Sequence, residues 1–522
     1  MASSSRSYRS RCSSAGSAPE SSGHTNDSQD AFVAALDLDA IREVALSARR
    51  AFADDSGSSS YPGQAGSETP SWVETLSCSV LTPPRRGADN VVYTLDFSDD
   101  VSWVIRIPMK EPWDDRCARS MRFSIVGMEY VMARTSVPIP KLLAYSCDAD
   151  CPLGHPYMLM EKVRGTRVID VWHDAAWWTG ERRKENMFES LAACMVELAD
   201  LEFDKIGELD RLPDGSHTIV PFSSARSMLL LQDQFEEQAG PDESPKEFGP
   251  FRSTHEFFRA LLDARRSTEN RPWLALLQMF IGALVDARTD GPPFAFGHPD
   301  FDSQNIFVDD VSGRVVGIID WDGVFVGPLQ IGALVYPSWL TIDWDPMMYD
   351  GWKRKPGEHD SEEDLRKYRK MYADAVGAAS GGKFASVTRN SHVLITLYLA
   401  ITNFLVTTPI VYDSLGTYVF GSPDIVHSVL GGIERGGWYS GSPDEPAEII
   451  REYFLILFSA ISADDGSLDW EQEPAAAASS GPSEDGDAED EHPALEHRSG
   501  EHDRAPAGMR DDADGSGCTV LE

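Results

Sequence analysis

Apolar and polar residues form short, strand-like runs in the first third of the chain. These runs are bounded by turn residues and predict strands at residues 78–81, 91–97, 102–108 and 156–161. An acidic turn at residues 98–100 separates the second strand from the third and is short enough for an antiparallel hairpin. This part of the sequence therefore predicts a small sheet.

Longer segments repeat apolar residues every three or four positions, which is typical of amphipathic helices. One such segment, residues 30–52, precedes the sheet. Another, residues 124–135, lies among the predicted strands and ends before Pro138 and Pro140. Beyond residue 163 the helical pattern dominates, and it predicts helices at residues 182–201, 254–266, 273–289, 361–376, 425–433 and 448–461.

The segment 391–412 is the most apolar of the helical segments. Its 22 residues include no Asp, Glu, Lys or Arg and are long enough to span a bilayer. Four Thr, His392 and Asn403 interrupt it, and Pro409 breaks its last turn. We therefore predict a buried helix of a large helical unit, and no membrane association.

The two ends of the chain differ in composition from the middle. Residues 1–28 are rich in Ser, and residues 464–522 contain 18 acidic and 3 basic residues. Segments of this kind bury too little apolar surface to fold, so we expect both ends to be disordered. Between them, the pattern divides into a helix with a linker at 29–70, a sheet-rich unit at 71–162 and a helical unit at 163–463.

Charge and cysteine content restrict the class of protein. The net charge of −38 argues against nucleic-acid binding, because such binding needs a basic face. Seven Cys are scattered without CxxC pairs, which indicates reduced thiols. The first 19 residues fit an Arg- and Ser-rich transit peptide loosely, but we interpret them as a disordered leader and expect a cytoplasmic protein.

The stretch that carries the chemistry is residues 297–327, GHPDFDSQNIFVDDVSGRVVGIIDWDGVFVG. Two β-like runs, residues 306–308 and 315–319, are separated by an acidic turn that contains Gly313. This arrangement predicts a hairpin, although an ordinary acidic hairpin on the surface would show a similar pattern.

Polar side chains flank both strands of this predicted hairpin. Asp300 and Asn305 precede its first strand, and Asp320 follows its second. Because the hairpin brings these positions to the same end, we expect their oxygens to converge. Carboxylate and amide oxygens are the ligands that Mg²⁺ prefers, and Mg²⁺ usually shares its site with substrate phosphates.

The order of these residues resembles the aminoglycoside phosphotransferase and choline kinase family. The family's loop reads approximately H-G-D-x-x-x-x-N and is followed by I-D-W, whereas this sequence has Pro299 in place of the Gly. The resemblance covers roughly residues 71–463. It implies an α+β, two-lobe, protein-kinase-like fold, with a five-stranded antiparallel sheet and one helix in the N-lobe and a large, mainly helical C-lobe. It also implies an ATP-dependent phosphotransferase that acts on a hydroxyl of a small molecule.

The resemblance implies a role for each residue of the catalytic stretch. Asp300 would orient the substrate hydroxyl and accept its proton, and Asn305 and Asp320 would coordinate Mg²⁺. His298 would brace the loop. Two further carboxylates, those of Asp302 and Asp322, would assist the metal or cap backbone groups.

The sheet-rich unit would hold the nucleotide, either ATP or GTP. The resemblance implies that the loop at Gly87 to Asn90 covers the phosphates and that Arg106 takes the position of the phosphate-binding Lys of kinases. Glu129 would form an ion pair with Arg106, although either residue would also suit an exposed surface. The adenine would lie against a hinge that includes Met160, Glu161 and Val163.

Some alternatives stay open from the sequence. A pseudokinase that binds a nucleotide or a partner without transfer is the first, and a protein kinase is the second, although the chain has no D-F-G or A-P-E segment. Residues 207–251 are rich in Gly, Pro and charge and predict an insertion that shapes acceptor specificity. The acceptor itself does not follow from the sequence.

Overall fold

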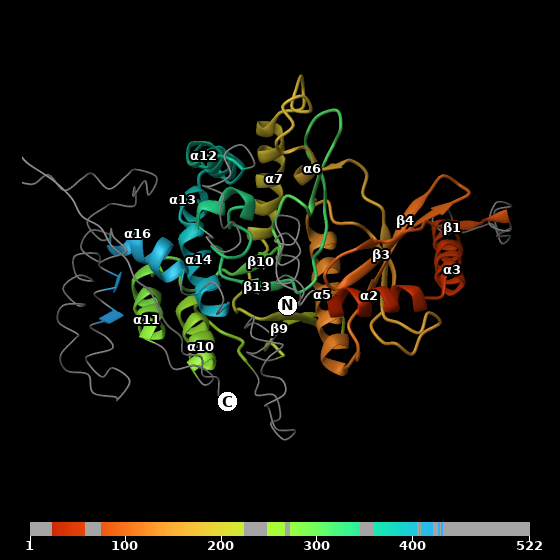
Figure 1. Cartoon of the computed structure of the whole chain (residues 1–522), viewed down its shortest axis with the longest axis horizontal. Helices are drawn as coiled ribbons and strands as arrows, with labels where there is room; N and C mark the ends of the chain where they lie inside the picture. Colours follow the sequence, from red (N-terminus) through yellow and green to blue (C-terminus); the bar gives the residue numbers. More distant parts are fainter. Residues whose placement is uncertain are drawn as a thin grey trace, which may run out of the picture. The chain divides into compact units, whose positions relative to one another are not determined.

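The structure is a computed structural model that describes residues 23–57, 75–223, 248–266, 272–344 and 359–403, and parts of 407–431 (Figure 1). The prediction of disorder for residues 1–28 is wrong for residues 23–28, which belong to the helix α2 (Gly23–Ala35). Residues 1–22, the tail 464–522 that we expect to be disordered and the predicted helix at 448–461 lie outside the described residues.

The N-lobe is built on one antiparallel sheet, as the sequence predicts. Its strand order is β1-β3-β4-β6-β5, with the two-residue β2 also paired to β3. The sheet thus has six strands where the family resemblance implies five. Alternate residues of β3 and β4, such as Tyr93, Leu95 and Ile105, are buried beneath it. The strands are β1 (Cys78–Val80), β2 (Arg85–Arg86), β3 (Asn90–Phe97), β4 (Ser102–Pro108), β5 (Leu142–Ser146) and β6 (Tyr157–Glu161).

The helix α5 (Asp115–Arg134) follows β4 and is longer than the predicted 124–135. It begins at Asp114, whose carboxylate accepts a hydrogen bond from the Cys117 amide at 2.9 Å. The first turns carry mostly polar residues, so the apolar repeat reveals only the second half. That half buries Ile125, Met128 and Val131.

The predicted single helix at 30–52 is wrong, because the segment forms two helices. These are α2 (Gly23–Ala35) and α3 (Leu38–Gly57). Asp37 separates them and accepts hydrogen bonds from the amides of Asp39 and Ala40 at 2.8 and 3.1 Å, which starts a new helix. The apolar repeat continues across this cap because Leu36 and Ile41 both pack into the core of the sheet.

The C-lobe is mainly helical, in agreement with the prediction. Its long helices lie around a single apolar core that includes Phe188, Phe257, Leu277 and Tyr372. The apolar segment 391–412 contains a buried helix that ends at Thr402, capped by Asn403. Across the residues that the structure describes, no helix is both long enough and apolar enough to cross a membrane. The helices are α6 (Val168–Val171), α7 (Lys184–Ala199), α10 (Thr254–Arg266), α11 (Pro272–Leu284), η2 (Ser338–Leu340), η3 (Ile342–Trp344), α12 (Glu362–Ala379), α13 (Ala385–Arg389), α14 (Ser391–Thr402), η5 (Ile410–Leu415) and α16 (Gly416–Phe420).

Short strands hold the stretch 297–327 in a closed loop. Its two ends pair with each other, because β10 (Ala295–Gly297) runs antiparallel to β13 (Phe325–Gly327). Inside this loop, β11 (Ile306–Val308) and β12 (Val315–Ile318) form the predicted hairpin. A third strand, β7 (Thr166–Arg167), covers the other edge of β11.

The predicted insertion at 207–251 lies partly within the described residues, at 207–223 and 248–251. It begins with a hairpin of β8 (Glu208–Arg211) and β9 (His217–Val220). Isolated bridges join it to the core, among them Gly207 to Val326 and Ile206 to Phe251. The hairpin therefore lies beside β13 and packs against α5.

Candidate active site

Asp300 lies in the loop between β10 and β11 and is almost completely buried. Its Oδ2 accepts hydrogen bonds from Asn305 Nδ2 at 2.9 Å and from Gln304 Nε2 at 2.8 Å. The same Asn305 nitrogen also donates to the backbone oxygen of Asp300 at 2.8 Å. Two side-chain amides thus hold one carboxylate oxygen and fix the orientation of the Asp300 side chain.

The environment of Asp300 raises its pKa to about 6. Burial is the main cause, and the nearby carboxylates of Asp302 and Asp320 raise the pKa further. The hydrogen bonds from Gln304 and Asn305 oppose this rise. An aspartate with a pKa of about 6 is ionised at neutral pH and can accept a proton.

His298 supports the loop from inside. Its Nε2 lies 2.8 Å from the backbone oxygen of Ile319, and its Nδ1 accepts a hydrogen bond from the Asp300 amide at 3.2 Å. Nε2 therefore carries the proton, and burial lowers the pKa of the imidazole to about 4. The neutral ring packs on Trp321 and joins the two halves of the site, which supports the bracing role.

Asp302 is fully buried. One of its oxygens accepts from Ser303 Oγ at 2.9 Å and the other from Ser338 Oγ, at the start of η2. Both contacts are to side-chain hydroxyls, so neither of the two predicted roles of Asp302, assisting the metal or capping backbone groups, is decided by them.

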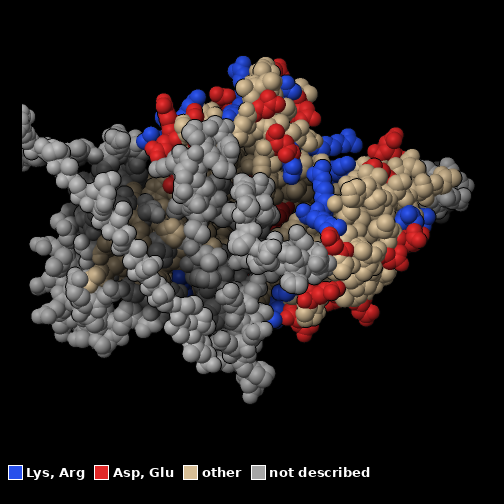
Figure 2. Space-filling model, viewed as in Figure 1, with Lys and Arg blue, Asp and Glu red and all other residues tan. Residues whose placement is uncertain are grey.

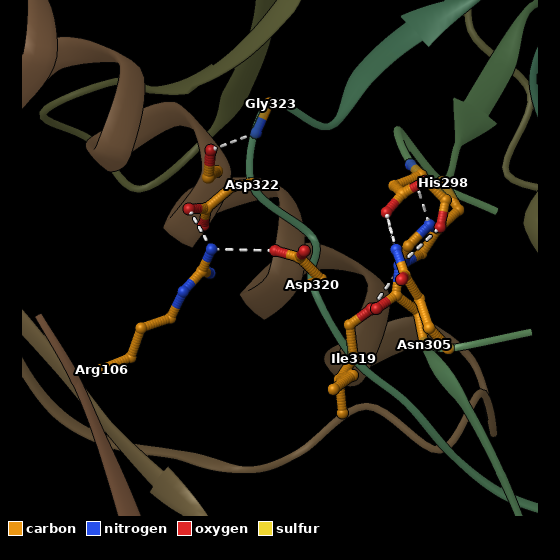
Figure 3. A network of polar contacts seen from close by, with 10 residues as sticks. Arg106, His298, Asn305, Ile319, Asp320, Asp322 and Gly323 are labelled. Atoms are coloured by element: carbon orange, nitrogen blue, oxygen red, sulfur yellow. Dashed lines mark hydrogen bonds and ion pairs between the residues drawn. The ribbon is translucent and has the colours of Figure 1, made fainter. Parts of the chain in front are cut away.

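The second half of the site begins at Asp320, which follows β12. Its φ of 68° lies in the left-handed region, which is uncommon for a residue other than Gly. The Ile319 amide donates to the Asn305 backbone oxygen at 2.9 Å. Asn305, just before β11, and Asp320, just after β12, therefore lie at the same end of the hairpin (Figure 3). The structure thus brings together Asp300, Asn305 and Asp320, as the sequence predicts.

Arg106 reaches this cluster from β4. Its Nη2 lies 2.8 Å from Asp320 Oδ1 and 2.6 Å from Asp322 Oδ2 (Figure 3). With its side-chain oxygen turned toward Arg106, Asn90 accepts from the same nitrogen at 2.7 Å. The guanidinium is buried and meets three polar partners, which excludes the alternative of an exposed surface residue.

The predicted ion pair between Arg106 and Glu129 is wrong. Glu129 Oε2 instead lies 2.5 Å from Arg211 Nη2, on the β8–β9 hairpin. The helix position explains the error. Ser124 faces the catalytic stretch and accepts from the Gly323 amide at 2.9 Å. Five residues further, Glu129 is rotated by about 140° around α5 and points elsewhere.

The loop at Gly87 is a tight turn. The Gly87 amide donates to the Asn90 backbone oxygen at 2.8 Å, so this N–H is engaged within the turn. A Cβ at Gly87 would lie 3.5 Å from the same oxygen, an ordinary contact, so the turn does not require Gly. Of the predicted loop residues, Asn90 is the one with a direct contact to Arg106.

The predicted hinge follows the end of the sheet. Met160 and Glu161 belong to β6, and the Glu161 amide donates to the Lys141 backbone oxygen at 3.0 Å. Val163 packs on Gly317, where a Cβ would lie 2.2 Å from Val163 Cγ1. Gly317 thus allows the hinge to approach β12 closely.

The residues present fit Mg²⁺ in their donor chemistry. Asn305 uses its side-chain nitrogen toward Asp300, so its Oδ1 is the atom left for a cation. Asp320 is one-third exposed and engages Arg106 through one oxygen. Mg²⁺ is usually held by one or two such ligands plus phosphate oxygens. The described residues include no cluster of three or more His, Cys, Asp or Glu side chains that could hold a metal ion.

A hollow of about 310 Å³ lies outside this cluster, at the start of α7. It is lined by four basic residues, Arg182, Arg183, Lys184 and Lys367, together with aromatic ones. On the face shown in Figure 2, acidic and basic side chains are interspersed over the described surface. The hollow includes none of the predicted site residues.

Comparisons with known proteins place the chain in a family. Residues 80–370, more than half of the chain, match the family model described as "Phosphotransferase enzyme family". Among solved structures, aminoglycoside phosphotransferase APH(4)-Ia is 15% identical, with a TM-score of 0.35 over 70% of this chain and 95% of that one. A putative fructosamine-3-kinase from Thermobifida fusca is 14% identical, with a TM-score of 0.37 over 65% and 92%. The family assignment rests on the family model.

Curated relatives are yeast proteins named "Altered inheritance of mitochondria protein 9, mitochondrial". The protein from Meyerozyma guilliermondii is 25% identical over 24% of this chain and 20% of its own length. The one from Clavispora lusitaniae is 22% identical over 42% and 35%. The matches thus cover about a third or less of the relatives' length. Their mitochondrial names contradict the prediction of a cytoplasmic protein, which was drawn from a leader sequence without a strong signal.

Proposed function

Since this chain belongs to the phosphotransferase enzyme family, we propose that it transfers the γ-phosphate of ATP, or of GTP, to a hydroxyl group of a small molecule. The observation that carries the proposal is the state of Asp300. Its carboxylate is buried, oriented by Asn305 and Gln304, and ionised at neutral pH. Phosphoryl transfer needs such a group to orient the attacking hydroxyl.

Asp300 would accept the proton of the substrate hydroxyl as that oxygen attacks the phosphorus atom. The side-chain amides of Asn305 and Gln304 hold Asp300 Oδ2, and the substrate hydroxyl would approach the carboxylate that they orient. His298 keeps the backbone of the loop in place through its bonds to Asp300 and Ile319. Asp302 fastens the loop to η2.

The nucleotide would lie between the sheet and the catalytic stretch. Arg106 would bind phosphate oxygens, and Met160, Glu161 and Val163 would lie beside the base, with Gly87 and Asn90 at the phosphate end. Asn305 and Asp320 would hold Mg²⁺, which neutralises charge on the phosphates when bound. Asp320 engages Arg106 through Oδ1, so Oδ2 is the oxygen that would meet the metal.

The test of this function is Asp300→Asn, assayed with ATP, Mg²⁺ and a metabolite extract. Mass spectrometry would first identify a compound that gains one phosphoryl group. Loss of a positioned base typically costs 10²–10⁴-fold, so turnover should fall by at least about 100-fold. The rise in melting temperature that ATP produces should persist. Asp310→Asn, a change on the exposed turn of the hairpin, is the matched control. Unchanged turnover in Asp300→Asn would refute the proposal.

A pseudokinase is the alternative, and one observation favours it. Arg106 engages both Asp320 and Asp322, so the proposed metal ligand is paired with a cation. Under this alternative, ATP with Mg²⁺ raises the melting temperature, yet no compound in a broad panel of hydroxyl compounds gains phosphate.

We also infer a mitochondrial location, which the names of the yeast relatives support. Fractionation of cells that produce the chain with a C-terminal tag would test it. Recovery of the tag in the cytosol alone would contradict the inference.

A further inference from the structure

Arg106 is shared between two carboxylates that are two residues apart. Its Nη2 contacts Asp320 at 2.8 Å and Asp322 at 2.6 Å (Figure 3). The side chain of Arg106 is only 10% exposed, so the charge depends on these partners. A buried cation that lost both would be strongly destabilised.

Asp322 is held in place by the helix α5. The next residue, Gly323, donates its amide to Ser124 Oγ at 2.9 Å, and that hydroxyl donates in turn to the Ser120 backbone oxygen at 3.0 Å. On the other side, Trp321 is buried and donates from Nε1 to the Ile318 backbone oxygen at 2.8 Å. The backbone around Asp322 is therefore fixed independently of any ligand.

The helix itself supplies no carboxylate to Arg106. Glu129 forms its ion pair with Arg211, and Ser124 of α5 hydrogen-bonds to the catalytic stretch. The connection between α5 and Arg106 thus runs through Ser124, Gly323 and Asp322.

We propose that Asp322 is a positioning residue that holds Arg106 toward the phosphates while Asp320 binds the metal. The proposal rests on the proposed nucleotide site but not on phosphate transfer. When Mg²⁺ takes Asp320, Arg106 keeps Asp322 as its counter-charge. Without Asp322, Arg106 turns fully to Asp320 and competes with the metal for that carboxylate.

The proposed role of Asp322 differs from that of an additional metal ligand. A positioning residue affects the metal only through Arg106, whereas a ligand affects it directly. A double-mutant cycle of Asp322→Asn and Arg106→Gln distinguishes the two. The readout is the Mg²⁺ concentration that gives half of the rise in melting temperature produced by ADP, measured on the full chain.

We expect Asp322→Asn to raise this Mg²⁺ concentration several-fold, and the rise to disappear when Arg106→Gln is also present. Glu129→Gln, which removes a carboxylate of the same region, should leave it unchanged. Binding of Mn²⁺ in the presence of ADP, followed by the EPR signal of free Mn²⁺, gives the same quantity where the stabilisation by ADP is small.

Two results would overturn the proposal. If Asp322→Asn still raises the required Mg²⁺ concentration when Arg106→Gln is present, Asp322 is a metal ligand. If Asp322→Asn alone does not raise that concentration, Asp322 does not position Arg106. Because neither readout involves turnover, a failure of the proposed phosphate transfer, seen in Asp300→Asn, would be recognised separately.

Discussion

Glu208 provides a stability test for the hairpin that packs against α5. It lies at the start of β8, and its Oε2 is buried without a hydrogen-bond partner in the described part of the chain. Burial raises the pKa of this carboxyl from 4.5 to about 7, against the opposing effects of Ser223 and Arg119. The folded protein therefore favours the protonated form of Glu208.

The sign of the pH effect follows from this pKa. Between pH 4.5 and 7 the folded state binds more protons at Glu208 than the unfolded state does, so this group lowers stability as pH rises. Each pKa unit corresponds to about 1.4 kcal/mol, so above pH 7 the cost is about 3 kcal/mol. Glu208→Gln keeps the shape and removes the charge, so it should recover most of that cost.

The assay is the melting temperature of Glu208→Gln and of the unchanged protein at pH 5.0 and 8.5. An unfolding entropy of about 2.1 cal/mol/K per residue converts the expected gain to roughly 3 °C at pH 8.5. At pH 5.0 the two proteins should melt within about 1 °C of each other. Asp210→Asn, the same carboxylate-to-amide change on the same strand, is the matched control. An equal effect of Glu208→Gln at both pH values would refute the reasoning.

Three further changes are predicted from single contacts. Gly297→Ala places a Cβ 2.5 Å from the Gly332 Cα, so it should destabilise the fold by about 1–3 kcal/mol in urea unfolding and reduce turnover. Trp172→Phe removes the bond from Nε1 to Asp360 Oδ2 at 2.7 Å and should cost about 1–3 kcal/mol by the same measurement, because Asp360 loses a donor. Burial lowers the pKa of His392 to about 3, so its contribution to stability is complete above pH 6.5 and is lost as pH falls toward 3; His392→Phe should flatten the decline in melting temperature over that range.

The sequence by itself determined the elements whose signals are local. The hairpin around Gly313 and the convergence of Asp300, Asn305 and Asp320 follow from strand patterning and turn residues, which act over a few positions. Four strands of the N-lobe sheet, β1, β3, β4 and β6, and the helices α10, α11, α12 and α14 follow from periodicity in the same way, whereas the short β2, β5 and α13 do not.

The tertiary structure decided which charged groups meet. Helical periodicity locates α5 but leaves its rotation undetermined to within one residue, and each residue turns the helix by about 100°. That rotation assigned Glu129 to Arg211 and left Arg106 to Asp322, a residue 216 positions further along the chain. The break between α2 and α3 is by contrast local: the Asp37 side chain accepts hydrogen bonds from the amides of Asp39 and Ala40, a capping signal that the apolar pattern does not record. Ion pairs across the fold depend on side-chain directions in space, and sequence spacing carries no information about those directions beyond one element.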